Sequence, residues 1–131
     1  MKKTWRTLLT VLLLVCFVVC AVLMLRQFCD YRKGAESAKL AAELAAEQER
    51  GALIIDVRPP EMFAAGHVEG AINIPAAKMR EQLDKLDKKR PLVVICKIGM
   101  NGYFMERMLK QSGFEVRNIM GGFTYLQGIL P

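Results

Sequence analysis

Cys96 is the residue of this chain best placed to do chemistry. It follows four apolar residues, 92–95, which predict a short buried strand. The next six residues, 97–102, include two glycines that permit a tight loop, and residues 103–111 carry apolar side chains at helical spacing. A cysteine between a strand and a helix N-terminus faces backbone N–H groups and the positive end of the helix dipole, which favour the nucleophilic thiolate. The alternative is a buried structural cysteine that behaves as a small apolar side chain.

The bulk composition narrows the classes of function. The chain has 131 residues and a formal net charge of +6, and its lysines and arginines are spread along the sequence. No nucleic-acid-binding motif accompanies them, so no nucleic-acid partner is expected. The single histidine, His67, excludes a site built from several imidazoles, and the four cysteines lack zinc-ligand spacing, so no metal site is expected.

Residues 1–33 predict a basic head and a membrane anchor. Residues 8–25 carry no charge and are almost wholly apolar, so as a helix they can just cross the hydrocarbon core of a bilayer. Trp5 and Tyr31 bracket the segment, as interfacial aromatic residues do. The main alternative is a cleaved signal peptide, but a small-x-small cleavage site is lacking. We therefore expect an uncleaved, single-pass anchor in the cell membrane.

The number of basic residues, which indicates the side of the membrane that the rest of the chain occupies, is the same at the two ends of the predicted span. Three basic residues flank each end of the span, namely Lys2, Lys3 and Arg6 before it and Arg26, Arg32 and Lys33 after it. The free amino terminus adds one charge to the head, which favours the head inside and the domain outside. The side matters because it determines which thiol pool the domain meets.

The remainder predicts a helix followed by one α/β domain. Residues 34–50 are rich in Ala, Glu, Gln and Leu and predict a juxtamembrane helix that also packs as the first helix of the domain. In the domain, residues 51–131, short apolar strands (52–58, 71–74, 92–95 and 114–120) alternate with helices (61–65, 78–86, 103–111 and 123–126). This alternation is typical of a small, doubly wound parallel sheet. Ligand sites in such sheets lie beyond the carboxyl ends of the strands, where Cys96 and Arg58 fall.

An ordered set of motifs in this domain resembles the rhodanese family. Its D-V-R…E-F…G-H…G-A-x-N-I-P signature is similar to Asp56, Val57, Arg58, Glu61, Phe63, Gly66, His67, Gly70, Ala71, Asn73, Ile74 and Pro75. Cys96 falls where the catalytic cysteine of that family falls, and Gly121 and Gly122 resemble its closing Gly-Gly turn. The resemblance covers about residues 52–130. The run CKIGMNGY is especially similar to the rhodanese modules attached to coenzyme A-disulfide reductases.

The resemblance implies a five-stranded doubly wound domain and a sulfurtransferase activity. Cys96 would take sulfane sulfur from a small donor (thiosulfate, a polysulfide or a low-molecular-weight persulfide), hold it as a persulfide and pass it to a thiol acceptor. The loop backbone would cradle the anion through Lys97, Ile98, Gly99, Met100, Asn101 and Gly102. The resemblance implies no metal and no organic cofactor.

Three further residues, Asp56, Arg58 and His67, are expected to support the site. By the resemblance, Asp56 and Arg58 tie loops together through an ion pair, with Glu61 as a further partner. His67 follows a glycine in a turn, so we expect it to brace that turn through a hydrogen bond; the alternative is a general base for the thiol.

Two positions of the loop depart from the family. Ile98 stands where Ser or Thr is frequent, and Asn101 stands where many members have Arg. Both changes remove contacts with an anionic donor. Lys97 restores one charge, but an ammonium does not replace a guanidinium fork. We therefore expect weak activity on thiosulfate.

Two other functions compete with sulfur transfer. An arsenate reductase or dual-specificity phosphatase would need an Arg six residues after the cysteine to clamp an oxyanion, and that position is Gly102. A membrane-tethered binding module, or a sensor of redox state or persulfides with little turnover, would fit the uncharged Ile98 and Met100. Turnover with a donor and an acceptor thiol separates the enzyme from such a module.

Overall fold

The computed structural model describes residues 2–127 of the chain. The last residues of the predicted domain, 128–131, lie outside the described part, as do the side chains of Lys2, Lys3 and Arg6 in the predicted basic head. The chain divides into two compact units, Met1–Ala35 and Glu36–Pro131.

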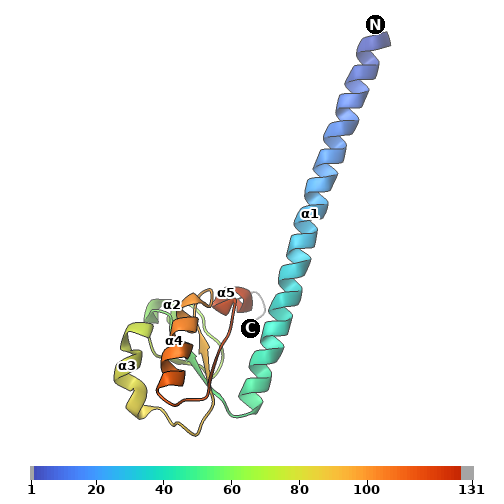
Figure 1. The fold of residues 1–131 in the computed structure, drawn as a ribbon. Helices are drawn as coiled ribbons and strands as arrows, with labels where there is room; N and C mark the ends of the chain where they lie inside the picture. The colour runs from blue at the N-terminus through green and yellow to red at the C-terminus, as the bar shows by residue number, and fades with distance from the viewer. Residues whose placement is uncertain (1, 128–131) are drawn as a thin grey trace. The chain divides into compact units, whose positions relative to one another are not determined.

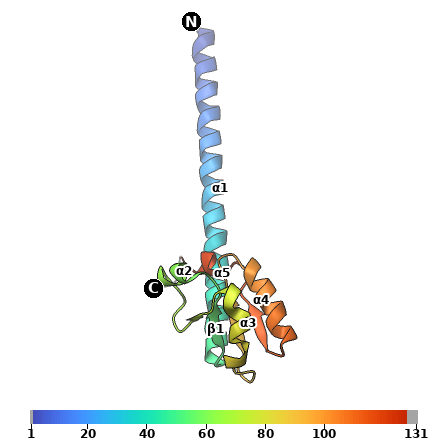
Figure 2. The same cartoon turned by 90° about the vertical axis from the view of Figure 1, so that its left-hand side faces the viewer.

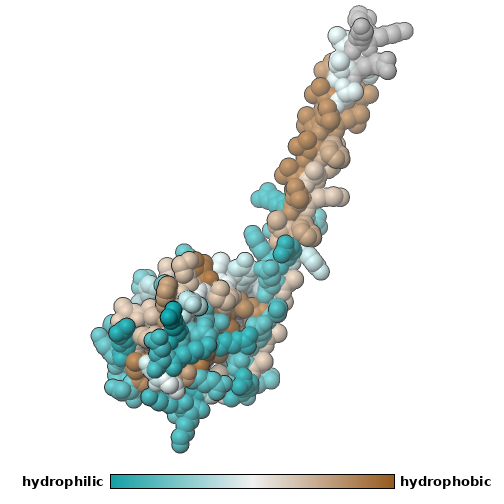
Figure 3. Space-filling model, viewed as in Figure 1, coloured by the Kyte–Doolittle hydropathy of each residue, from teal (hydrophilic) through white to brown (hydrophobic). Residues whose placement is uncertain are grey.

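The first unit belongs to helix α1, Lys2–Glu49. Its apolar side chains, including those of Val15 and Val19, are exposed over the whole predicted span and give this unit an apolar surface (Figure 3). Within the described residues, one helix is long and apolar enough to cross a membrane, and its most apolar window has a mean hydropathy of 3.2. Cys16, Cys20 and Cys29 are free and exposed on this helix.

The second unit contains a parallel sheet of four strands in the order β2-β1-β3-β4. These strands are β1 (Leu53–Asp56), β2 (Ile72–Asn73), β3 (Leu92–Ile95) and β4 (Val116–Asn118). The two central strands, β1 and β3, pair over their full length, from Leu53 with Leu92 to Asp56 with Ile95. Both strands are almost wholly buried and, apart from Asp56 at the end of β1, all their residues are apolar, as expected for a sheet covered on both faces.

Successive residues of each strand point to opposite faces of the sheet and build two apolar cores. In β3, Leu92 and Val94 enter one core and Val93 and Ile95 enter the other. The first core lies under α3 (Met79–Gln82) and α4 (Met100–Gln111), which lie side by side in both ribbon views (Figure 1, Figure 2). Cys96 belongs to this core. The doubly wound parallel fold predicted from the sequence is therefore confirmed.

The second core packs against α5 (Gly122–Leu126) and the last turns of α1. Leu44 of α1 is 3 % exposed there, and Leu40 and Ala41 pack beside it. The segment that precedes the first strand is thus the first helix of this unit, as its composition predicted. Its end is fixed by the Ala52 N–H, which donates to the Glu47 carbonyl at 3.0 Å.

Several elements differ from the sequence-based expectations. Residues 2–127 form four strands and not five. β2 has two residues because it is an edge strand that pairs only with Ile55 and Asp56, and it is soon followed by Pro75, which lacks an N–H. The expected helix 78–86 is divided into η1 (Ala76–Lys78), α3 and η2 (Leu83–Lys85). The short helix α2, Pro60–Ala64, is present as predicted.

Candidate active site

The Cys96 thiol lies at the carboxyl end of β3 and is 3 % exposed. The backbone N–H of Gly99 donates a hydrogen bond to its Sγ, with a nitrogen–sulfur distance of 2.8 Å. Gly99 adopts φ +95°, a left-handed conformation that L side chains rarely adopt. A Cβ at this position would lie only 3.1 Å from the Gly121 nitrogen. A glycine is therefore required at this point of the loop that turns towards the sulfur.

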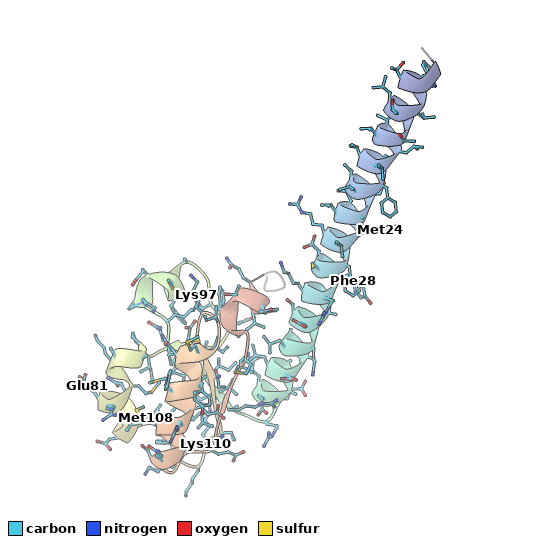
Figure 4. All side chains as sticks on the ribbon, turned by 45° about the horizontal axis from the view of Figure 1, so that its top comes forward. Met24, Phe28, Glu81, Lys97, Met108 and Lys110 are labelled. Carbon is cyan, nitrogen blue, oxygen red and sulfur yellow. The ribbon has the colours of Figure 1, made fainter. Side chains whose placement is uncertain are left out.

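The predicted cradle, residues 97–102, is partly loop and partly helix. Met100, Asn101 and Gly102 form the first turn of α4, which begins three residues earlier than its sequence predicted. Lys97 is exposed and lies at the end of the domain near α5, opposite to Met108 and Lys110 (Figure 4). Within residues 2–127, Gly99 supplies the hydrogen bond that Sγ accepts.

Helix α5 fixes the first two carbonyl groups of the loop. The Phe123 N–H donates to the Cys96 oxygen at 2.8 Å, and the Thr124 N–H and hydroxyl donate to the Lys97 oxygen at 3.0 and 2.7 Å. Gly122 permits this approach, because a Cβ there would overlap the Cys96 and Lys97 carbonyl groups. The two carbonyl groups are thus bonded to α5 and are not available to repel an anion on the sulfur. The Gly-Gly motif predicted α5; Thr124 gave no signal in the sequence.

Asp56 and Arg58 form the expected ion pair. Arg58 Nη2 lies 2.6 Å from Asp56 Oδ2, and both side chains are almost completely buried, at 5 % and 1 % exposure. The same nitrogen donates to the Gly66 oxygen at 2.7 Å, and the guanidinium lies 3.6 Å from the centre of the Phe123 ring. The pair therefore joins the end of β1, the Gly66 turn and α5. Glu61 is exposed and is not part of this pair among the described residues.

His67 braces its turn locally. Its Nδ1 lies 3.0 Å from the Phe63 carbonyl oxygen, and the two rings stack with centres 3.8 Å apart. The side chain is exposed. Among the described residues, no contact joins His67 to Cys96, so the structure does not bring the imidazole to the thiol.

Two surface features adjoin the Cys96 loop. A cavity of about 200 Å³ opens beside Lys97, and its lining comprises Arg58, Met62, Ala65, Gly66, Lys97, Phe123, Thr124 and Gln127. Five large apolar side chains, each more than half exposed, form what we term the apolar rim, namely Ile98, Met100, Tyr103, Phe104 and Met120. Within residues 2–127, no cluster of three or more metal-ligating side chains is found.

The family follows from comparison with known proteins. Residues 40–128 match the rhodanese-like domain. The chain belongs to the rhodanese-like family. The resemblance seen in the sequence motifs is thereby confirmed, and the matched region extends into the last turns of α1.

The relatives of this rhodanese-like chain include sulfurtransferases. The chain is 32 % identical over 95 residues to the thiosulfate sulfurtransferase GlpE of Pseudomonas aeruginosa. The matched region covers 71 % of this chain and 86 % of the relative. The human single-domain sulfurtransferase TSTD1 is 25 % identical with a TM-score of 0.59, covering 69 % of this chain and 94 % of that one. These relatives support sulfurtransferase function at the level of the family.

A structure of a larger protein is also similar. The reduced CoADR-RHD of Bacillus anthracis superimposes with a TM-score of 0.62 and 35 % identity over 65 % of this chain, which spans 15 % of that protein. This similarity agrees with the resemblance of the CKIGMNGY run to rhodanese modules of coenzyme A-disulfide reductases.

Proposed function

We propose that this chain is a sulfurtransferase that carries sulfane sulfur as a persulfide on Cys96. The observation that carries the proposal is the position of the Cys96 sulfur, which is held at the end of a buried strand with the Gly99 N–H 2.8 Å away. A backbone N–H donor stabilises a thiolate before the reaction, and α5 holds the Cys96 and Lys97 carbonyl groups in hydrogen bonds.

The reaction consists of two displacements at sulfur. The Cys96 thiolate attacks the sulfane sulfur of the donor; a new S–S bond forms, and the donor's bond to that sulfur breaks as its remaining group leaves with the electron pair. An acceptor thiolate then attacks the outer sulfur of the Cys96 persulfide, and the Cys96 thiolate leaves. The sulfur is passed on without net oxidation or reduction, so no cofactor takes part.

The surface around the loop favours a donor other than thiosulfate. Thiosulfate is a small dianion, yet Lys97 is the only charged residue among residues 97–102. The loop also carries the exposed apolar side chains of Ile98 and Met100. A polysulfide or a low-molecular-weight persulfide with an apolar portion fits this surface better, and a thiol is the acceptor. Anchored by residues 8–25, the domain would work at a membrane.

The test measures the loading of Cys96 directly. The full chain in detergent is incubated with thiosulfate or with a low-molecular-weight persulfide, and its mass is recorded before and after treatment with dithiothreitol. We expect a gain of one sulfur atom that dithiothreitol removes, with faster loading from the persulfide. Cys96→Ser should abolish the gain, whereas Cys29→Ser, which removes an exposed cysteine of α1, should retain it.

A second function is favoured by the same apolar rim. Five exposed apolar side chains beside the thiol also suit a module that binds a partner or senses persulfides with little turnover. The two functions differ in the second displacement. If no donor loads Cys96 in the folded protein, sulfur transfer is excluded; if Cys96 loads but no thiol unloads it, the sensing module is correct.

A further inference from the structure

Asn118, the last residue of β4, reaches the Cys96 loop from the neighbouring strand. Its Nδ2 donates to the Gly99 carbonyl oxygen at 3.0 Å, and the side chain is buried, with 8 % exposed. In the sheet Asn118 pairs with Val94, two residues before Cys96. The amide therefore lies beside the strand that delivers the thiol, although it makes no contact with the sulfur itself.

The bond from Asn118 acts on the residue that also contacts the sulfur. The Gly99 oxygen accepts a second bond from the Tyr103 N–H at 3.0 Å, and the Gly99 N–H donates to Cys96 Sγ at 2.8 Å. Glycine has more backbone freedom than any other residue, so its orientation must be fixed from outside. With the carbonyl held by two donors, rotation about the Gly99 backbone is restricted and the N–H stays directed at Sγ.

Packing alone does not account for an amide at position 118. Asn118 Oδ1 has no hydrogen-bond partner among the described residues, and a buried polar atom without a partner is unfavourable. Gly102 makes room for this oxygen, because a Cβ on residue 102 would overlap it. A leucine of similar size would fill the space without an unpaired oxygen. The donor half of the amide is thus the part that the fold uses.

We propose that Asn118 is a positioning residue for the sulfur chemistry of Cys96. By holding the Gly99 carbonyl it keeps the Gly99 N–H aimed at Sγ, and this N–H stabilises the thiolate that accepts sulfur. The inference rests on the proposed function, in which that thiolate is the nucleophile.

The experiment compares the reactivity of the Cys96 thiol at two pH values. The full chain in detergent is treated with iodoacetamide, and alkylation of Cys96 is followed by mass spectrometry of its peptide, which separates it from the other three cysteines. We expect Asn118→Leu to lower the alkylation rate near neutral pH about tenfold relative to the wild type, because the Gly99 N–H is then no longer held against the reacting sulfur. At strongly alkaline pH the rates of the two proteins should be nearly equal.

Asn73 provides a matched control. Its Nδ2 donates to the Asp56 and Arg58 carbonyl oxygens, both at 2.9 Å, so it braces a different loop. Asn73→Leu likewise removes an amide donor that bonds backbone carbonyl groups, but it should leave Cys96 alkylation near neutral pH unchanged. A purely structural role for Asn118 would give the two variants the same alkylation profile, and this result would overturn the inference.

A second variant decides the question if Asn118→Leu does not fold. Gly102→Ala retains the amide but pushes Oδ1 away, and alanine is otherwise favoured over glycine in a helix. We expect it to lower neutral-pH alkylation in the same way; a rate equal to that of the wild type would contradict the proposal. Loading with a persulfide is measured separately, so a failure of sulfur transfer would not be confused with a failure of this inference.

Discussion

At the scale of single residues, the Asp56–Arg58 pair makes the clearest energetic prediction. Arg58→Met would leave the Asp56 carboxylate buried without its partner, which typically destabilises a protein by about 3–5 kcal/mol. Adding Asp56→Asn should recover part of this loss, because the uncompensated charge is then removed. Urea unfolding of the full chain in detergent measures both changes.

The control for this prediction is an exposed ion pair. Lys110 and Glu106 lie 2.7 Å apart on α4, and Lys110 is 58 % exposed. Lys110→Met should change the free energy of unfolding by only about 0.3–0.5 kcal/mol. An effect of Arg58→Met as small as this would show that the buried pair is not needed for stability.

The sequence predicted some residues of the site and not others. Cys96, the Asp56–Arg58 ion pair and the Gly121–Gly122 turn were recognisable because each has a distinctive residue type at a strand end. Asn118 was not recognisable, since a polar residue in an edge strand usually faces solvent. Its function depends on which carbonyl lies opposite it, and this is set by the pairing of β3 with β4. Cradle roles for the rest of residues 97–102 stay a prediction.

At the scale of elements, the proposed preference for one donor over another can be tested at the Cys96 loop. Asn101, in the first turn of α4, is exposed and carries no charge. Asn101→Arg would add a guanidinium that can bond an anionic donor, and bonds to charged groups contribute about 1.5–3 kcal/mol. We expect kcat/KM for thiosulfate to rise at least about tenfold, measured with a thiol acceptor.

Two comparisons give this prediction its specificity. Asn101→Gln lengthens the side chain without adding charge and should leave the thiosulfate rate nearly unchanged. With a persulfide donor, Asn101→Arg should also have little effect. An equal rise for both donors would mean that the arginine acts on the thiol itself and not on the donor.

The elements themselves were predicted best where their apolar pattern was clearest. The strands β1 and β3 contain buried apolar runs, and α4 carries apolar side chains at helical spacing; the positions of all three agree with the prediction within three residues. The short β2 was overestimated because strand length depends on the partner, and Ile55 and Asp56 are all that β1 offers it. The divided helix around α3 follows no signal in the sequence.

At the scale of the whole molecule, the first unit predicts membrane attachment. Its helix exposes apolar side chains over the length of a bilayer core. We expect the full chain to remain in the membrane pellet after extraction with alkaline carbonate. Val15→Arg together with Val19→Arg should release it, because each arginine near the centre of a span costs about 2.5–3.5 kcal/mol on insertion.

An arginine outside the span provides the control. Gln27→Arg places the same side chain two residues beyond the predicted span, where it can reach the interface, and should leave the protein in the pellet. Extraction of the wild-type chain by carbonate would contradict the anchor. If the anchor holds, labelling exposed lysines of the second unit, such as Lys85 and Lys89, with a reagent that cannot cross the membrane would assign the compartment of that unit.

The depth of the Cys96 sulfur has a consequence for the order of events in a catalytic cycle. The empty thiol is 3 % exposed, so bulky disulfides reach it poorly. A second sulfur extends the side chain by an S–S bond of about 2 Å, which would carry the terminal atom towards the rim. The outer sulfur of the persulfide would thus be more accessible to solvent than the Cys96 sulfur that carries it. The persulfide form would therefore react with acceptor thiols, whereas the unloaded Cys96 thiol would be protected from side reactions.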